Sequence, residues 1–262
     1  MSLPPYRVRG QGPLVVLVHG TAPDLFDRLE SELLPTHRVA RLARRGFPGS
    51  GLPVVRELGP HVDDLAELIQ REGGRATVVG WSVGGILAVE LLQRAPERVD
   101  GLVLIEPPWL AKRSPTLRML AGILIGKLLG AFGRAGAGGE RFLRWALSRR
   151  DGVNELDVLS SADRERVRAA GEAMLAELDG GTGEHLAGRV AAARVPVALL
   201  AGDQSTPEFG RAAARLGQAL GVEPRVIPGA GHLMQETHAR EVAQVLRGLS
   251  AREGEAARAA GR

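Results

Sequence analysis

The pentapeptide Gly80-Trp81-Ser82-Val83-Gly84 follows the apolar run Ala76-Thr77-Val78-Val79 and opens a stretch of helical character, Val83 to Arg94. A serine at such a junction can occupy a sharp turn from a strand into a helix, in which its own backbone is strained and its hydroxyl is presented. Only glycine fits beside it, where the strand and the helix nearly touch. The chain is therefore constrained to a fold in which a buried strand runs directly into a helix, and Ser82 is a candidate nucleophile.

The composition agrees with one globular domain. The chain has 262 residues, 44% of them hydrophobic, which is enough for a single large α/β core. It contains no cysteine, which excludes disulfides, thiolate metal sites and a cysteine nucleophile. The formal net charge is +4 with no basic run interleaved with aromatic residues, so we expect no nucleic-acid partner. The first residues form no apolar segment of the secretory type, and we expect a cytoplasmic protein.

Short apolar runs alternate with amphipathic helical patterns, which is typical of a mostly parallel sheet covered by helices. We therefore predict an α/β fold whose core comprises residues 1–108 and 195–250. Strands are predicted at Leu14–Val18, Arg38–Leu42, Ala76–Val79, Gly101–Ile105, Val195–Ala201 and Arg225–Ile227. Helices are predicted at Leu25–Leu34, Val62–Arg71, Val83–Arg94, Phe209–Leu220 and Ala239–Leu249. Residues 251–262 are predicted to form a flexible polar tail.

The strand pattern stops between Pro108 and Arg194, and residues 109–194 are helical in character. A structureless loop of this length is improbable in a compact domain, so the segment is predicted to be an inserted helical cap. Its first helix, Leu117 to Phe132, is apolar but interrupted by Lys127 and three glycines. A membrane span needs about 20 apolar residues, so we expect no stable membrane insertion. We favour a helix packed over a pocket; contact with a membrane surface or with a second copy in a homodimer stays open.

Five motifs occur in an order that resembles the α/β-hydrolase superfamily. They are a strand ending in His19-Gly20, the loop Arg44 to Ser50, the stretch Gly80 to Gly85, the strand end Leu104 to Pro108, and Gly229-Ala230-Gly231-His232. The resemblance covers about residues 12–108 and 195–250 and leaves the predicted cap unmatched. In particular, the chain is similar to compact bacterial hydrolases related to esterases, cofactor-free perhydrolases and haloalkane dehalogenases. The resemblance implies an α/β-hydrolase fold with a mostly parallel central sheet flanked by helices.

Ser82 and His232 are the candidate nucleophile and base. A serine hydroxyl needs an imidazole within hydrogen-bond reach to take its proton. His232 follows a predicted strand and lies in the turn-rich loop Pro228 to His232, as the chain order serine, acid, histidine requires. His185, in the predicted cap, and His238, on the final helix, are interpreted as solvent-facing.

The resemblance also implies two backbone N–H donors for the oxyanion that forms during acyl transfer. Val83, directly after the nucleophile, supplies one donor, and Thr21, after His19-Gly20, supplies the other. Haloalkane dehalogenases carry an aspartate nucleophile and a halide-binding asparagine at the positions of Ser82 and Thr21. Dehalogenation is therefore disfavoured.

The acid that would complete a triad has two candidates. Most of the superfamily places it three residues after a glycine that ends the penultimate strand, but the residue three after Gly202 is Ser205. Asp203 lies two residues too early in the same loop, and its alternative interpretation is a turn cap. Glu106, between a buried strand and two prolines, matches the acid position that some relatives use, although it could be a structural hydrogen-bond acceptor. We favour Glu106 and keep Asp203 as the alternative acid.

Other kinds of site find no support in the sequence. The loop Arg44 to Ser50 lacks the Gly-Lys-Ser/Thr ending of a phosphate-binding loop, and no Gly-x-Gly-x-x-Gly opens a helix after the first strand. No cluster has metal-ligand spacing. We therefore expect neither a metal nor a cofactor.

The sequence predicts a serine hydrolase that cleaves a carboxylic ester, thioester or lactone through an acyl-enzyme. The substrate is expected to be a small molecule with an apolar acyl or natural-product-like group, in a pocket shaped by Trp81, Trp109 and Leu124. The serine at position 205 keeps a second hypothesis open. This is a cofactor-free cyclase or epimerase on the same fold, with His232 as proton shuttle.

Overall fold

The computed structural model describes residues 2–109, 115–178, 183, 186 and 195–260. Its centre is a seven-stranded sheet in the order β1-β3-β2-β4-β5-β6-β7. The strands are β1 (Tyr6–Arg9), β2 (Leu14–Val18), β3 (Arg38–Leu42), β4 (Ala76–Trp81), β5 (Val99–Ile105), β6 (Val197–Gly202) and β7 (Arg225–Ile227). β1 pairs antiparallel with β3, and the other five pairs of neighbours are parallel. The carboxyl ends of the parallel strands therefore meet at one edge.

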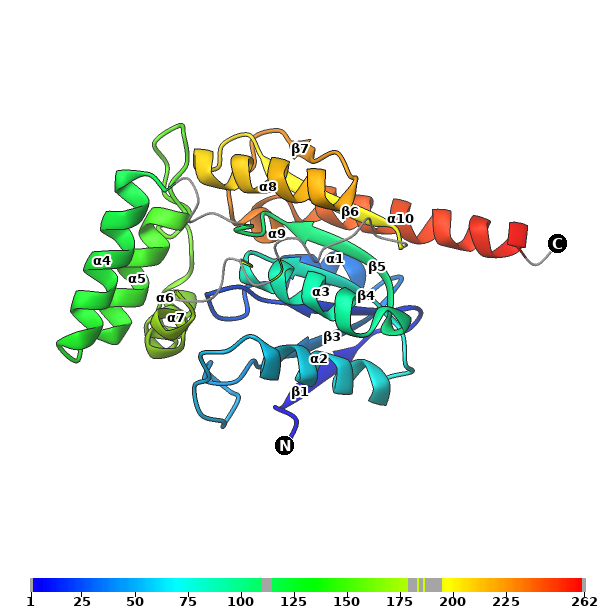
Figure 1. Ribbon diagram of the computed structural model, residues 1–262, viewed down its shortest axis with the longest axis horizontal. Helices are drawn as coiled ribbons and strands as arrows, with labels where there is room; N and C mark the ends of the chain where they lie inside the picture. Colours follow the sequence, from blue (N-terminus) through cyan, green and yellow to red (C-terminus); the bar gives the residue numbers. More distant parts are fainter. Residues whose placement is uncertain (1, 110–114, 179–182, 184–185, 187–194, 261–262) are drawn as a thin grey trace.

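Helices cover both faces of this sheet (Figure 1). One face is covered by α2 (Gly59–Arg71), α3 (Val83–Arg94) and α8 (Pro207–Leu220). The other face is covered by α1 (Asp27–Leu33) and α10 (Ala239–Ala260), with the short α9 (Met234–Thr237) before α10. A 3₁₀ turn, Pro96–Arg98, joins α3 to β5 and contacts α2 and α3. β2 and β4 are buried along their whole length. Burial on both faces is why these strands are continuous apolar runs in the sequence.

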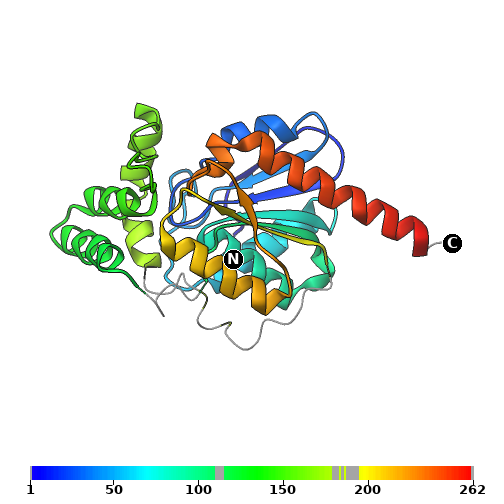
Figure 2. The same cartoon turned by 90° about the horizontal axis from the view of Figure 1, so that it is seen from above.

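The described residues between β5 and β6 form four further helices. They are α4 (Leu117–Ala131), α5 (Ala135–Ala146), α6 (Ser161–Ala169) and α7 (Gly171–Glu177), called the cap helices below. Figures 1 and 2 show them together at one end of the molecule, opposite the end of α10. Glycines let α4 and α5 approach closely, since a Cβ added at Gly126 would lie 2.9 Å from the carbonyl oxygen of Gly138. His185 lies outside the described residues.

Two segments differ from the sequence predictions. Tyr6–Arg9 form β1, which was not predicted because its residues alternate between half-buried and exposed at a sheet edge. The final helix continues to Ala260 instead of ending at Leu249, so a helix replaces the predicted tail over residues 251–260. Apart from Gly254, this segment consists of Ala, Arg and Glu, which are strong helix formers.

Candidate active site

Ser82 occupies the turn between β4 and α3 with a strained backbone, φ 54° and ψ −125°. Its backbone N–H donates to the carbonyl oxygen of Ile105 over 2.8 Å, which ties the turn to β5. A Cβ added at Gly80 would lie 2.5 Å from the carbonyl oxygen of Gly84, and one added at Gly20 would lie 2.6 Å from the Ser82 Cβ. Glycine is therefore required by these close approaches, and the strain is of the kind that accumulates at functional sites.

Glu106 follows β5 and is the second strained residue. Its φ is 43°. Within the described ranges, Ser82 and Glu106 are the two non-glycine residues of positive φ. The Glu106 side chain is fully buried, with Oε2 2.7 Å from Nδ1 of His232 and Oε1 accepting the Gly202 N–H over 2.7 Å. A carboxylate accepts, so the hydrogen lies on Nδ1, and Nε2 of the neutral imidazole is left as an acceptor.

Asp203 has a different environment. Its side chain is exposed, and Oδ1 accepts the backbone N–H of Gly229 over 2.8 Å, which is the contact of a turn cap. The nearby Ser205 is buried, and its hydroxyl has no hydrogen-bond partner among the described residues. The structure thus brings Glu106, and not Asp203, into contact with the His232 imidazole.

Besides Glu106, three neighbours fix the position of His232 and its loop. The Phe209 ring stacks on the imidazole with centroids 3.7 Å apart and planes 11° apart. Nε1–H of Trp81 donates to the His232 carbonyl oxygen over 2.8 Å. From the insertion, the buried Glu155 accepts the N–H of Leu233 through Oε2 over 2.9 Å, and burial raises the pKa of the Glu155 carboxyl. The loop that carries His232 is therefore held by the sheet, by α8 and by the insertion.

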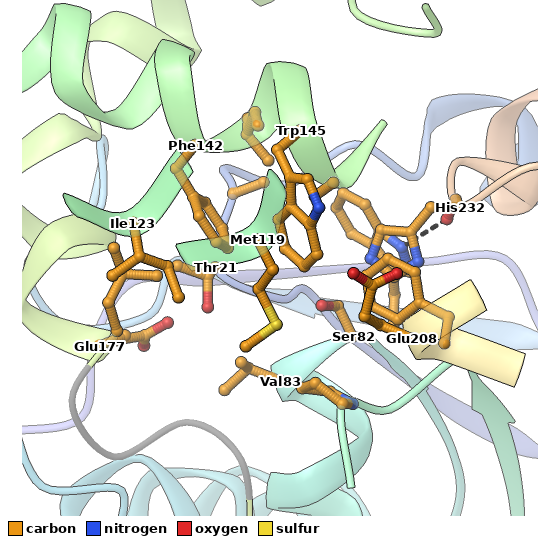
Figure 3. Close-up of a pocket in the computed structure, with 17 residues that line it drawn as sticks. Thr21, Ser82, Val83, Met119, Ile123, Phe142, Trp145, Glu177, Glu208 and His232 are labelled. Atoms are coloured by element: carbon orange, nitrogen blue, oxygen red, sulfur yellow. Dashed lines mark hydrogen bonds between the residues drawn. The ribbon is translucent and has the colours of Figure 1, made fainter. Parts of the chain in front are cut away.

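Ser82 and His232 line one cavity beneath the cap helices, together with Thr21 and Val83 (Figure 3). Val83 is the first residue of α3, so its backbone N–H has no partner within the helix. Most of the remaining wall is apolar and includes Met119, Ile123, Phe142, Leu143, Trp145 and Phe209. The cavity measures about 50 Å³ as lined by the described residues.

The three predicted pocket residues have different positions in the structure. Trp81 lines the cavity. Trp109 is buried beside Ile86 in the core on the other side, so its prediction as a pocket residue is wrong. Leu124 is 60% exposed, whereas its neighbour Ile123 lines the cavity. Successive residues of a helix point about 100° apart. Apart from Arg118 and Lys127, α4 consists of apolar residues and glycine, so its pattern did not indicate which face turns inward.

Glu177, on α7, is a buried carboxylate of the cavity wall that sequence reasoning missed. It forms an ion pair with the guanidinium of Arg44, which is also buried. Nη1 of Arg44 donates to the carbonyl oxygens of Gly20, over 3.0 Å, and His19, over 3.2 Å. Burial raises the pKa of Glu177, and the Arg44 charge opposes this shift. A cap helix is thereby connected to the loop that carries Thr21, and no sequence motif indicated this connection.

Glu208, at the start of α8, is a second buried carboxylate of the cavity wall that was not predicted (Figure 3). Its Oε1 accepts from the hydroxyl of Thr116, which in turn caps α4 by accepting the N–H of Met119 over 3.3 Å. It follows the loop that leaves β6 at the carboxyl edge of the sheet, where ligand sites of open α/β sheets occur. That rule could have identified it.

His61, on α2, is buried 3.7 Å from the Glu177 carboxylate, and burial together with the Arg44 charge lowers the pKa of His61 to about 2. The unfolded chain has the ordinary value of about 6.5. Below this pH the unfolded state binds a proton that the folded state does not, so stability is lost as pH falls. We expect this histidine to lower the free energy of unfolding by up to about 1.4 kcal/mol per pH unit.

Urea titrations between pH 7 and pH 5 test this expectation, with His61→Leu compared to the wild type. The variant should lose stability less steeply with falling pH. Equal slopes for the two proteins would show that His61 accepts a proton in the folded state.

Two features are absent from the part of the chain that the structure describes. No three His, Cys, Asp or Glu side chains there are grouped so that they could hold a metal ion. None of the helices described has the length and apolar character needed to cross a membrane.

A strained serine between a parallel strand and a helix, sharing a cavity with a histidine held by a carboxylate, defines an α/β-fold hydrolase. The chain belongs to the alpha/beta hydrolase family, whose family model matches residues 15–245. The resemblance noted in the sequence and the predicted fold class are thereby confirmed.

Curated relatives match a limited stretch of the chain. An uncharacterized hydrolase, YraK, of Bacillus subtilis is 33% identical over 108 residues, which are 39% of this chain and 40% of that protein. A pimeloyl-(acyl-carrier protein) methyl ester esterase of Nitrosomonas europaea is 36% identical over 99 residues, which are 37% of this chain and 38% of that protein. The chain thus aligns with less than half the length of these relatives.

Solved structures match nearly the whole chain. A bromoperoxidase from Bacillus anthracis has a TM-score of 0.78 at 21% identity, with 94% of each chain covered. Est816, described as an N-acyl homoserine lactone degrading enzyme, has a TM-score of 0.71 at 22% identity, with 93% of this chain and 95% of that chain covered. At such identities the likeness shows a shared fold.

Proposed function

We propose that this chain is a serine hydrolase that cleaves a carboxylic ester, thioester or lactone through an acyl-enzyme at Ser82. The observation that supports this most directly is the 2.7 Å contact between His232 Nδ1 and Glu106 Oε2, beside a cavity that Ser82 also lines. It leaves Nε2 of the imidazole as the acceptor that a serine hydroxyl requires. Serine, histidine and glutamate would then form the catalytic triad.

In the proposed reaction the Ser82 hydroxyl oxygen attacks the substrate carbonyl carbon while His232 Nε2 takes the hydroxyl proton. The backbone N–H groups of Thr21 and Val83 stabilise the negative charge that develops on the carbonyl oxygen. His232 then gives its proton to the leaving oxygen or sulfur, and water hydrolyses the acyl-serine by the reverse sequence. Glu106 holds the imidazole in one tautomer and stabilises the imidazolium during both transfers.

The cavity favours a small apolar acyl group. A volume of about 50 Å³ accommodates only a few water-sized groups, and its wall is mostly apolar. Relatives bear names that include a methyl ester esterase and a lactone-degrading enzyme, which supports carboxylic esters and lactones as the substrate class. We propose a short-chain ester or lactone as the substrate.

The second hypothesis from the sequence, a cyclase or epimerase with His232 as proton shuttle, has less support. It depended on the serine at position 205, where most of the superfamily has the acid. The Glu106 carboxylate on the imidazole provides an acid from another strand, so the serine at 205 no longer argues against a triad. We therefore propose hydrolysis.

A fluorophosphonate probe tests the acyl-enzyme proposal directly, because it phosphonylates an activated serine whatever the natural substrate is. We expect one label per chain, on the tryptic peptide that contains Ser82, by mass spectrometry. The Ser205→Ala variant should label like the wild type, and Ser82→Ala should not label. Labelling of another residue, or equal labelling of both variants, would contradict the proposed mechanism.

The acyl-chain preference should depend on which face of α4 is altered. Ile123 lines the cavity, so Ile123→Asp should slow hydrolysis of a butyrate ester more than that of an acetate ester. Each buried methylene contributes about 0.8 kcal/mol, so we expect the butyrate-to-acetate rate ratio to fall by about tenfold. Initial rates with p-nitrophenyl esters measure this ratio.

Leu124→Asp is the matched control, since the substitution is identical and the residue is 60% exposed. It should leave the butyrate-to-acetate ratio close to that of the wild type. If Leu124→Asp changes the ratio as strongly as Ile123→Asp does, the acyl group does not bind in this cavity.

A further inference from the structure

The outer face of α4 exposes an unusual amount of apolar surface. Six of the nine exposed large hydrophobic side chains in the described part of the chain lie in or directly after this helix: Leu117, Leu120, Leu124, Ile125, Leu128 and Phe132. Leu117 and Phe132, at its two ends, are 85% and 81% exposed. Figure 1 shows α4 at the outermost edge of the molecule. An exposed apolar patch of this extent marks an interaction surface.

The inner side of α4 is already packed against the rest of the protein. Met119 is buried and, with Ile123, faces the cavity, while Gly122 lies against Trp145 of α5. An apolar face is thus left over after the helix has been anchored. The fifteen residues of α4 extend about 22 Å, so this face is long and continuous.

The segment that contains this face carries a net positive charge. Residues 117–146, which form α4, α5 and their connection, contain five basic residues and one acidic residue. Their formal charge of +4 equals the formal net charge of the whole chain, so the remainder has equal numbers of basic and acidic residues. Arg118 and Arg141 line a groove beside α4. The groove also contains Arg144, paired with Asp157, Arg149, paired with Asp151, and Arg150, which donates to the carbonyl oxygen of Ser205. An apolar face bordered by cationic side chains can be held at an anionic membrane surface by apolar burial together with electrostatic attraction.

We propose that the outer face of α4 docks on an anionic lipid bilayer. Its leucines would enter the boundary between headgroups and acyl chains, and Arg118 and Arg141 would contact lipid phosphates, as long cationic side chains do at interfaces. A second copy of the chain fits this surface less well. In a two-fold dimer through this face, residues 117–146 of one copy would lie against the same residues of the other. Each of these segments has a formal charge of +4, so the two would repel each other. Docking on lipid goes beyond the proposed function and does not depend on it.

The structure gives such docking a consequence for the cavity. Met119 and Ile123, which line the cavity, belong to the same helix as the docking face. One side of α4 would therefore contact lipid while its other side lines the cavity. Docking would therefore hold the cavity next to the lipid interface, where apolar substrates concentrate.

Vesicle co-sedimentation of the full chain tests the proposal. We expect the protein to sediment with vesicles of phosphatidylcholine and phosphatidylglycerol in equal parts, to bind pure phosphatidylcholine at least about tenfold more weakly, and to dissociate with rising salt. The double variant Leu124→Glu/Leu128→Glu and the double variant Arg118→Glu/Arg141→Glu should each weaken binding by about tenfold or more. Val226→Glu, on β7, and Arg240→Glu, on α10, are the matched controls at exposed positions and should bind like the wild type.

The altered leucines are exposed, so circular dichroism and the melting temperature should be unchanged. If the double leucine variant does not fold, the single variant Phe132→Glu replaces it, because that residue is 81% exposed.

Failure to bind anionic vesicles, or binding that neither pair of substitutions reduces, would overturn the proposal. A lipid-free dimer in sedimentation velocity that Leu124→Glu/Leu128→Glu dissociates would assign the face to a second copy. Binding of purified acidic carrier protein without binding of vesicles would assign it to a protein partner. Either result overturns lipid docking.

Discussion

We expect the Ser82→Ala variant to lose at least about 10³-fold in turnover of an activated short-chain ester, because loss of a triad nucleophile removes the acyl-enzyme pathway. The melting temperature should change little. The hydroxyl contributes little packing at this half-exposed position, and alanine meets the same backbone strain at φ 54° as serine does. Steady-state rates with p-nitrophenyl acetate and a thermal melt measure both quantities.

Ser205→Ala is a matched control for this substitution. Ser205 is also near the site, is buried, and has a hydroxyl without a partner among the described residues, so its removal should cost little activity. If Ser82→Ala keeps more than about a tenth of the wild-type rate, the acyl-enzyme mechanism is wrong.

The second large effect is expected for Glu106→Gln, which should lower turnover by up to about 10⁴-fold. The glutamine oxygen can still accept the Gly202 N–H, but this turns its amide N–H toward His232 Nδ1. Nδ1 must then act as the acceptor, so the hydrogen moves to Nε2. The imidazole is left in the tautomer that cannot take the proton of Ser82.

Asp203→Asn is the control, because the asparagine oxygen can still accept the Gly229 N–H. We expect this variant to keep most of the activity. The reverse ranking of the two variants would move the acid to Asp203. If both variants stay within about tenfold of the wild type, a serine–histidine dyad or the proton-shuttle hypothesis becomes the better account.

The comparison of turnover between Glu106→Gln and Asp203→Asn requires that both variants fold. Glu106 is fully buried with two short hydrogen bonds, so its replacement can cost stability as well as activity. A thermal melt of each variant separates the two effects. A Glu106→Gln variant that melts like the wild type and is inactive would support a role for Glu106 in orienting the imidazole.

The sequence by itself determined the features that depend on local chain geometry. The run Ala76 to Val79 followed by glycine, serine and glycine specified a strand that turns into a helix at Ser82, because only glycine tolerates the contacts at Gly80 and Gly84. Alternating apolar and amphipathic segments specified the mostly parallel sheet, because strands buried on both faces must be apolar throughout. The carboxyl edge of that sheet then gathered Ser82, Glu106 and His232 from three loops.

Tertiary structure alone decided the contacts between distant segments. The choice of Glu106 over Asp203 as the partner of His232 depended on the side-chain directions of two neighbouring strand ends. The inward face of α4 could not be predicted, because apolar residues lie on every side of the helix and its orientation is set by the packing of α5 and the cavity. The pair Arg44–Glu177 joins residues 133 positions apart. A buried ion pair has no local signature, since its cost is offset only by a partner that folding brings into contact.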